Sequence, residues 1–163
     1  MDFSRLDQRR TLIGGAAAIL LAISILFLPW YSLTDVPERV DQNAWLCGTG
    51  ELSCTGFETF PILRWLLLAS CLAPLILAWV IVRGHKLSWS PGELTMVVGF
   101  TVMVLIGYNG LIDIPAPADG LEFGTSLDYG YWIALLCAVT IAAVAFLRSL
   151  TGQTRERKAP GTV

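Results

Sequence analysis

Two cysteines lie close together in the stretch NAWLCGTGELSC, residues 43–54, and their types and spacing permit three kinds of chemistry. Six residues, two of them Gly, separate Cys47 from Cys54, so the two sulfurs can reach the separation of a disulfide. A metal site needs further ligands, and a catalytic dithiol usually takes the tighter Cys-x-x-Cys form. Disulfides persist in oxidising compartments, so the choice depends on where the surrounding elements place this stretch.

The composition of the chain is typical of a membrane protein. Hydrophobic residues make up 55% of the sequence, the mean hydropathy is +0.64, and 15% of the residues are charged, against about 25% in soluble domains. Roughly 20 helical residues cross a hydrocarbon core about 30 Å thick. Four apolar windows are long enough to cross it, at about residues 11–30, 62–82, 94–112 and 131–147.

These windows are expected to be helices, because a helix satisfies its own backbone hydrogen bonds inside lipid and the windows do not alternate like barrel strands. Basic residues before the first window also fit a signal peptide, but its apolar run is long and lacks a small-x-small cleavage site. We therefore expect it to remain as an anchor. The sequence predicts an all-α membrane protein, with residues 1–163 forming a single four-transmembrane-helix bundle.

The distribution of charge predicts the orientation of this bundle, because cytoplasmic flanks of membrane helices retain Lys and Arg. Most of the basic residues fall in three segments: before the first window, in the loop 83–93, and in the tail 148–163, which is expected to be flexible. Most acids fall in the two other loops, 31–61 and 113–130. We expect a multi-pass protein of the bacterial plasma membrane with both termini in the cytoplasm and these two loops outside.

The predicted orientation places Cys47 and Cys54 in the first outer loop, where a structural disulfide is the expected state. A redox-active pair and two unpaired thiols remain as alternatives. The outer loops contain no histidine, and the single one, His85, falls on the opposite side. We therefore predict no metal site and no cofactor.

Other residues of the predicted helices are candidates for a pocket or for helix contacts. Cys71 and Cys137 are expected to pack in the bundle core as small hydrophobic residues. Ala134, Ala138 and Ala142 form a stripe of small residues on one face of the fourth helix, which permits close helix approach. Asn109 is expected to bond across helices or to line a small outward-facing cavity, and a pocket between helices is expected near Asn109 or Cys71.

No Asp, Glu, Lys, Arg or His lies in the central part of any predicted span, so the usual signature of ion and proton pathways is missing. No catalytic residue is predicted. The sequence favours a non-catalytic accessory, assembly or scaffold subunit, whose partners are the lipid bilayer and other membrane subunits or a second copy, and not nucleic acid. The alternatives are a thiol–disulfide or quinone-linked membrane oxidoreductase, and a carrier or receptor for an apolar small molecule or lipid.

The loop skeleton Trp30, Trp45, Cys47 and Cys54 is similar in part to claudins. Ala44 replaces the Leu of their Gly-Leu-Trp run, and the cysteine gap is shorter than theirs. The whole chain more closely resembles small four-helix membrane proteins of high-GC, actinobacterial-type bacteria. The features that carry this resemblance are LPWYSL after the first window, NAW in the loop and YGYWIALL at the fourth window. The resemblance implies a four-helix membrane fold and brings no activity or site with it.

Overall fold

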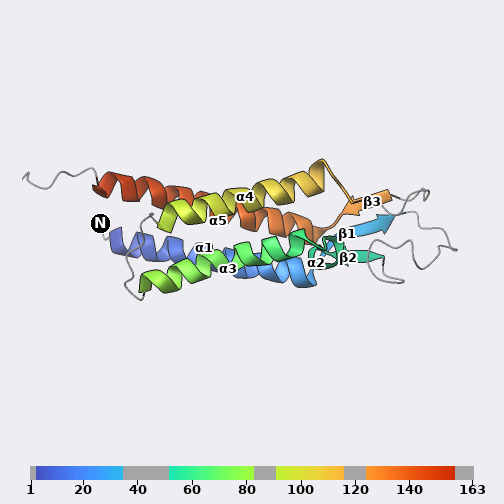
Figure 1. The fold of residues 1–163 in the computed structure, drawn as a ribbon, viewed down its shortest axis with the longest axis horizontal. Helices are drawn as coiled ribbons and strands as arrows, with labels where there is room; N and C mark the ends of the chain where they lie inside the picture. Colours follow the sequence, from blue (N-terminus) through green and yellow to red (C-terminus); the bar gives the residue numbers. More distant parts are fainter. Residues whose placement is uncertain (1–2, 35–51, 83–90, 116–123, 157–163) are drawn as a thin grey trace, which may run out of the picture.

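A computed structural model describes residues 3–34, 52–82, 91–115 and 124–156 of the chain. Four long helices run along the long axis of the molecule, and a small sheet with one short helix lies at one end (Figure 1). The long helices are α1 (Phe3–Phe27), α3 (Leu63–Val82), α4 (Pro91–Leu111) and α5 (Tyr129–Glu156). We call the end that carries the sheet the sheet end, and the opposite end, where α1 begins and α5 finishes, the tail end.

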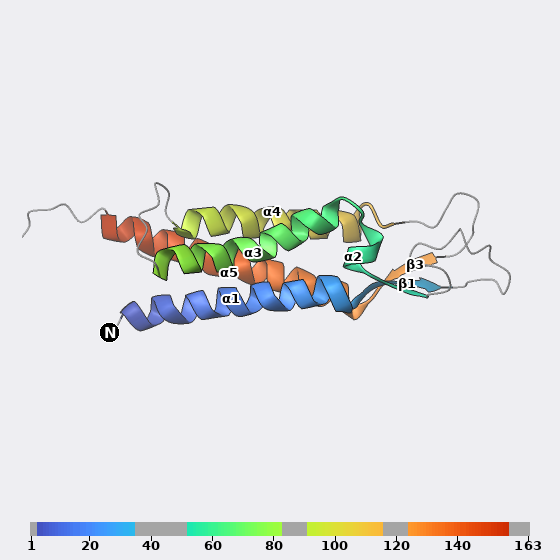
Figure 2. The same ribbon diagram turned by 60° about the horizontal axis from the view of Figure 1, so that its bottom comes forward.

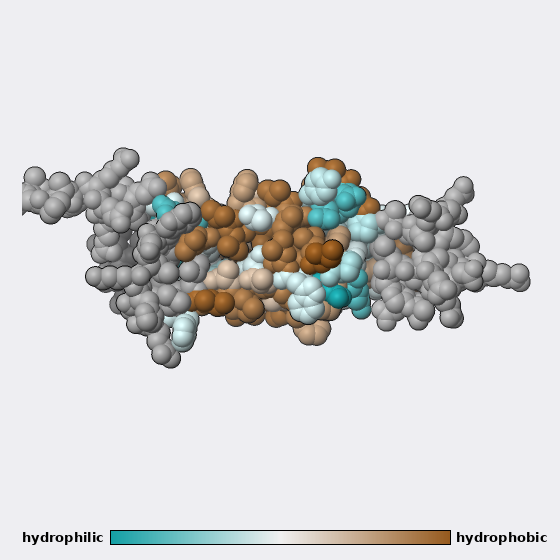
Figure 3. Space-filling view, in the orientation of Figure 1, coloured by the Kyte–Doolittle hydropathy of each residue, from teal (hydrophilic) through white to brown (hydrophobic). Residues whose placement is uncertain are grey.

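Three of these helices have spans long and apolar enough to cross a membrane: Arg9–Phe27, Glu93–Leu111 and Tyr129–Leu150. In α3, the apolar stretch Leu63–Ile76 is shorter. Figure 3 shows a band of hydrophobic surface over the middle of the molecule, with hydrophilic residues near the sheet end. The mostly helical fold is thus confirmed and is compatible with a membrane protein, whereas the fourth crossing and the orientation stay predictions.

Small and branched residues make up most of the core between the helices, and three aromatic side chains, Trp30, Tyr31 and Tyr131, are buried at its sheet end. From α1 and α5, Ala18 and Ala138 are fully buried and allow the two helices to pack closely. Many large side chains face outward instead, including Phe27, Leu72 and Phe100, which are 73%, 54% and 57% exposed. A lipid environment permits such an apolar exterior, because lipid tails are as apolar as these side chains.

A three-stranded antiparallel sheet occupies the sheet end and was not predicted from the sequence. Its order is β2-β1-β3, with β1 (Pro29–Thr34) between β2 (Ser53–Thr55) and β3 (Gly124–Leu127). Tyr31 pairs with Cys54 on one side and with Leu127 on the other. The strands lie within the expected loops 31–61 and 113–130, apart from the start of β1. β1 follows α1, β3 precedes α5 and β2 precedes α2, and the helix packing brings these three segments to the same end of the bundle.

The helix boundaries also differ from the predicted ones. α1 ends at Phe27 instead of residue 30, since Pro29 lacks an amide hydrogen and starts β1. α5 continues to Glu156, into the segment from residue 148 that was expected to be flexible. Gln, Arg and Glu in that segment favour helix. α4 begins at Pro91, a residue suited to the first helical position.

The helix α2 (Gly56–Thr59) begins with a capping box and connects the sheet to α3. Thr55 accepts a hydrogen bond from the Glu58 backbone nitrogen at 3.3 Å, and the Glu58 carboxylate accepts one from the Thr55 nitrogen at 3.0 Å. Figure 2 shows α2 between the sheet and the start of α3. This short helix turns the chain from β2 back into the bundle.

Candidate functional site

A buried hydrogen-bonded junction connects the helices to the sheet. The Ser24 hydroxyl of α1 donates to the Gly130 carbonyl oxygen of α5 at 2.6 Å. The indole nitrogen of Trp30 donates to the Ser24 carbonyl and hydroxyl oxygens at 3.1 and 3.2 Å. Ser24 is fully buried and Trp30 is 1% exposed. Because each buried polar atom here has a partner, this serine and this tryptophan hold α1, β1 and α5 together.

Two buried tyrosines extend the junction toward α4. The Tyr31 hydroxyl donates to the Asn109 carbonyl oxygen at 3.2 Å, and the Tyr131 hydroxyl donates to the Ile106 carbonyl oxygen at 3.3 Å. Burial, and secondarily the nearby Tyr131 phenol, raises the pKa of Tyr31 well above its ordinary value. A phenol that stays neutral and already donates its proton to a backbone carbonyl is suited to structure and not to proton transfer.

Two carboxylates at the sheet end hold the starts of helices. Asp128 accepts a hydrogen bond from the Tyr129 nitrogen at 2.7 Å, and its other oxygen accepts one from the Ser32 hydroxyl at 3.3 Å. Glu58 completes the capping box of α2. These two acids are therefore engaged in local structure.

The cysteines fall into two groups. Cys54 lies in β2 and is fully buried, whereas Cys47 lies outside the described residues. Cys71 of α3 and Cys137 of α5 are free and buried in the bundle core. Among the residues that the structure describes, no group of three His, Cys, Asp or Glu side chains could hold a metal ion.

The other candidate pocket and contact residues lie in different places. Ala134 and Ala138 are fully buried in the core, near the buried Cys71. Ala142 lies at the contact of α5 with α4. The Asn109 side-chain amide donates to the Leu105 carbonyl oxygen of its own helix at 2.8 Å. The structure therefore does not gather these residues around one cavity.

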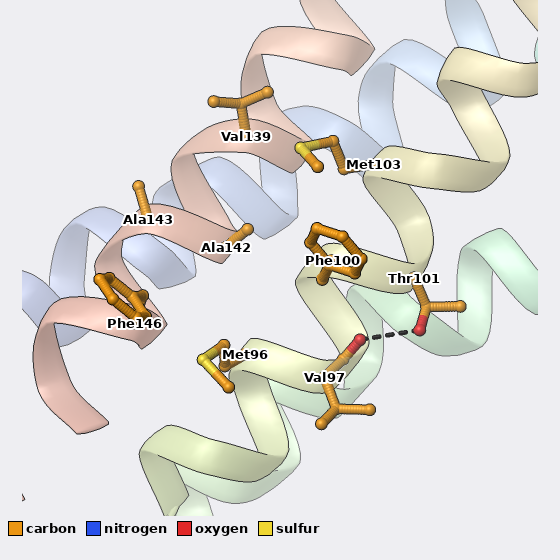
Figure 4. Close-up of a pocket in the computed structure, with 9 residues that line it drawn as sticks. All are labelled: Met96, Val97, Phe100, Thr101, Met103, Val139, Ala142, Ala143 and Phe146. Atoms are coloured by element: carbon orange, nitrogen blue, oxygen red, sulfur yellow. Dashed lines mark hydrogen bonds between the residues drawn. The ribbon is translucent and has the colours of Figure 1, made fainter. Parts of the chain in front are cut away.

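An apolar groove with a volume of about 470 Å³ lies between α4 and α5. Met96 and Phe100 of α4 face Ala142 and Phe146 of α5 across it (Figure 4), and Ala143 also contributes to its lining. Its other lining residues are Val97, Thr101, Met103 and Val139. The Thr101 hydroxyl donates to the Val97 carbonyl oxygen of its own helix at 2.8 Å, so it offers no free donor to a ligand. The groove can therefore hold only an apolar group.

Sequence reasoning named Ala142 but missed the rest of the groove. Met96, Phe100 and Met103 follow the three- and four-residue steps of one helix face, as do Val139 and Phe146 across the groove. In a uniformly apolar helix, however, the residues of such a face are no more hydrophobic than the residues around them. The periodic signal that reveals a buried face in a soluble protein is therefore weak here.

The comparisons with known proteins identify no relative: no protein-family model, curated protein or solved structure matches the chain.

Proposed function

We propose that the protein is a non-catalytic subunit of a membrane complex, which uses the groove between α4 and α5 to bind a transmembrane helix of a partner subunit or of a second copy. The observation that carries this proposal is the groove itself, which is lined by small alanines of α5 and by large apolar side chains of both helices. Small residues let a neighbouring helix approach closely, and methionines adapt to its shape. The engaged polar groups of the junction, described above, support a structural role.

The orientation in the membrane is part of the same proposal. We infer that α3 is the fourth span, since it continues to Val82 and has 20 residues. The sheet end then faces the outside, and both termini face the cytoplasm. The distribution of Lys and Arg in the sequence supports this orientation.

We further propose that a disulfide joins Cys54 to Cys47. Cys54 is buried and is not among the free cysteines of the described residues, which are Cys71 and Cys137. Cys47 is the remaining cysteine of the four in the sequence. Such a bond would hold the segment before β2 against the sheet.

The disulfide is tested by counting thiols in the unfolded protein before and after reduction. We expect two reactive thiols before reduction and four after it. Cys47→Ser and Cys54→Ser should each reduce stability by about 2–3 kcal/mol, the range for a short closed loop. Four thiols without reduction would contradict the bond, and a pair that cycles in cells would favour the oxidoreductase.

Site-directed photo-crosslinking tests the proposed subunit role. A benzophenone side chain in place of Phe100 or Phe146 lies in the groove, and the same group in place of Phe27 is a matched control on exposed α1 surface. We expect a protein adduct of defined mass at the two groove positions and none at position 27. The mass of the adduct distinguishes a second copy from a different subunit.

Two results would contradict the subunit role. One is labelling of lipid alone at all three positions, and the other is a lone monomer after extraction in mild detergent. The volume and apolar lining of the same groove also favour a second candidate, a carrier for an apolar small molecule or lipid. Native mass spectrometry would support it by finding one bound apolar compound that Ala143→Trp, which fills the groove, removes.

A further inference from the structure

Arg64, the second residue of α3, is held between aromatic rings at the sheet end of the bundle. Its guanidinium carbon lies 4.7 Å from the centroid of the Phe57 ring and 5.5 Å from that of the Trp65 ring. The two rings meet edge to face, with centroids 5.8 Å apart. These contacts favour this position of the guanidinium, and a side chain that is already positioned loses less conformational entropy when it binds a ligand.

The charge of Arg64 has no counter-ion in the part of the chain that the structure describes. Its Nε atom is buried and has no hydrogen-bond acceptor. Glu58, the nearest acid along the chain, is occupied by the capping box with Thr55. The guanidinium also lies in the first turn of α3, where the helix dipole adds further positive charge. The guanidinium charge and the helix dipole would therefore both stabilise an anion beside Arg64.

The surface around Arg64 is suited to a lipid. Trp65 is 61% exposed beside it, and Leu72 and Ile76 continue along the same exposed face of α3 toward the tail end. Tryptophan prefers the headgroup level of a bilayer, which places Arg64 at the depth of the lipid phosphates. A cation at phosphate depth above an apolar helix face matches the two parts of a phospholipid.

We propose that Arg64 binds the phosphate of an anionic membrane lipid in the leaflet at the sheet end. The terminal guanidinium nitrogens donate to the phosphate oxygens, Phe57 and Trp65 hold the guanidinium in place, and an acyl chain lies along Leu72 and Ile76. This site is separate from the groove between α4 and α5, so it does not depend on any partner subunit.

The test is fluorescence quenching of the full-length protein in vesicles of phosphatidylcholine that contain either chain-brominated phosphatidylglycerol or chain-brominated phosphatidylcholine. The difference between the wild type and Trp65→Phe gives the signal of Trp65. We expect the anionic lipid to occupy the site at least threefold more strongly than the zwitterionic lipid. The preference should fall as salt is raised, because screening weakens the charge interaction.

Arg64→Gln should abolish this preference, and Arg64→Lys should keep part of it, because lysine retains the charge without the planar fork. Arg9→Gln removes one positive charge from the other end of the bundle and should leave the preference unchanged. The proposal is overturned if the wild type shows no preference or if Arg64→Gln keeps it. It is also overturned if inorganic phosphate, added to the protein in detergent, changes Trp65 emission as strongly as the lipid does.

Discussion

At the scale of single residues, the most informative side chains are the hydroxyls within the apolar helices. Ser24 and Ser70 have the same chemistry and lie in similar helices, but their hydroxyls do different things. Ser24 bonds across to Gly130 of α5, whereas Ser70 bonds to Leu66 of its own helix at 2.8 Å. A hydrogen bond from a hydroxyl to its own helix, such as that of Ser70, contributes little to the contacts between helices.

The comparison of Ser24→Ala with Ser70→Ala tests this difference. We expect Ser24→Ala to lower the free energy of unfolding by about 1 kcal/mol, the net value of a hydrogen bond between elements. Ser70→Ala should change it by less than about 0.5 kcal/mol. Both are measured by denaturant or thermal unfolding in mild detergent. Equal effects would mean that the bond from Ser24 to Gly130 does not stabilise the junction.

Tyr31 is expected to make the stability of the folded protein depend on pH in the alkaline range. Its pKa is raised in the folded state by burial, while an unfolded tyrosine titrates near pH 10. Stability should thus be unaffected by this group below about pH 10 and should fall as the pH rises above it, because the unfolded state loses the proton first. Tyr31→Phe should remove this part of the decline, measured as the difference in unfolding free energy between pH 8 and pH 11. Identical declines in the two proteins would contradict the assignment.

At the scale of elements, the contact between α4 and α5 depends on a missing side chain. A Cβ atom added to Gly99 would lie 2.8 Å from the Ala142 backbone nitrogen and 3.0 Å from the Ala142 Cα atom. The backbone of α5 cannot yield as a flexible side chain can, so the two helices would have to separate. Gly107, on the same helix, has no atom within 4 Å of the equivalent position.

These two glycines form a matched pair for mutation. Gly99→Ala should destabilise the protein by about 1–3 kcal/mol through overpacking. Gly107→Ala should be neutral or slightly stabilising, since alanine favours helix by up to about 1 kcal/mol. Unfolding in detergent measures both. A stabilising Gly99→Ala would show that α4 and α5 are not in close contact at this point.

The long helices could be predicted from the sequence, but the strands between them could not. The helices follow from uninterrupted apolar runs, and the cap of α2 from the spacing of Thr55 and Glu58. The three strands have only 6, 3 and 4 residues, too few for an alternating pattern to stand out. The strands form because helix packing brings their segments together. This packing cannot be read from the sequence of any one segment.

The candidate site was less accessible to sequence reasoning than the fold. Asn109 suggested a cavity because it is polar in an apolar helix, yet its amide bonds to its own helix. Phe100 and Phe146 do not stand out from the other apolar residues of their windows, yet they line the groove. In the sequence, Arg64 is a single charge near the start of the second apolar window. Its aromatic contacts require Phe57 of a different helix, and the sequence alone does not place that ring.

At the scale of the whole molecule, the account depends on how the bundle is placed in the membrane. The span Arg9–Phe27 has 19 residues, or about 28 Å of helix at 1.5 Å per residue, which matches the hydrocarbon core. The sheet, the proposed disulfide and Arg64 all belong to one end of the bundle. If that end faces the outside, the disulfide is in an oxidising compartment and the basic tail is inside.

Labelling of intact cells with a membrane-impermeant thiol reagent tests this placement most directly. Ile114→Cys introduces a thiol at a site that is 41% exposed at the sheet end, and Thr162→Cys introduces one near the C-terminus. The native Cys71 and Cys137 are buried and serve as background. We predict that position 114 reacts in intact cells and that position 162 reacts only after the cells are permeabilised. Labelling of position 162 from the medium would contradict the account.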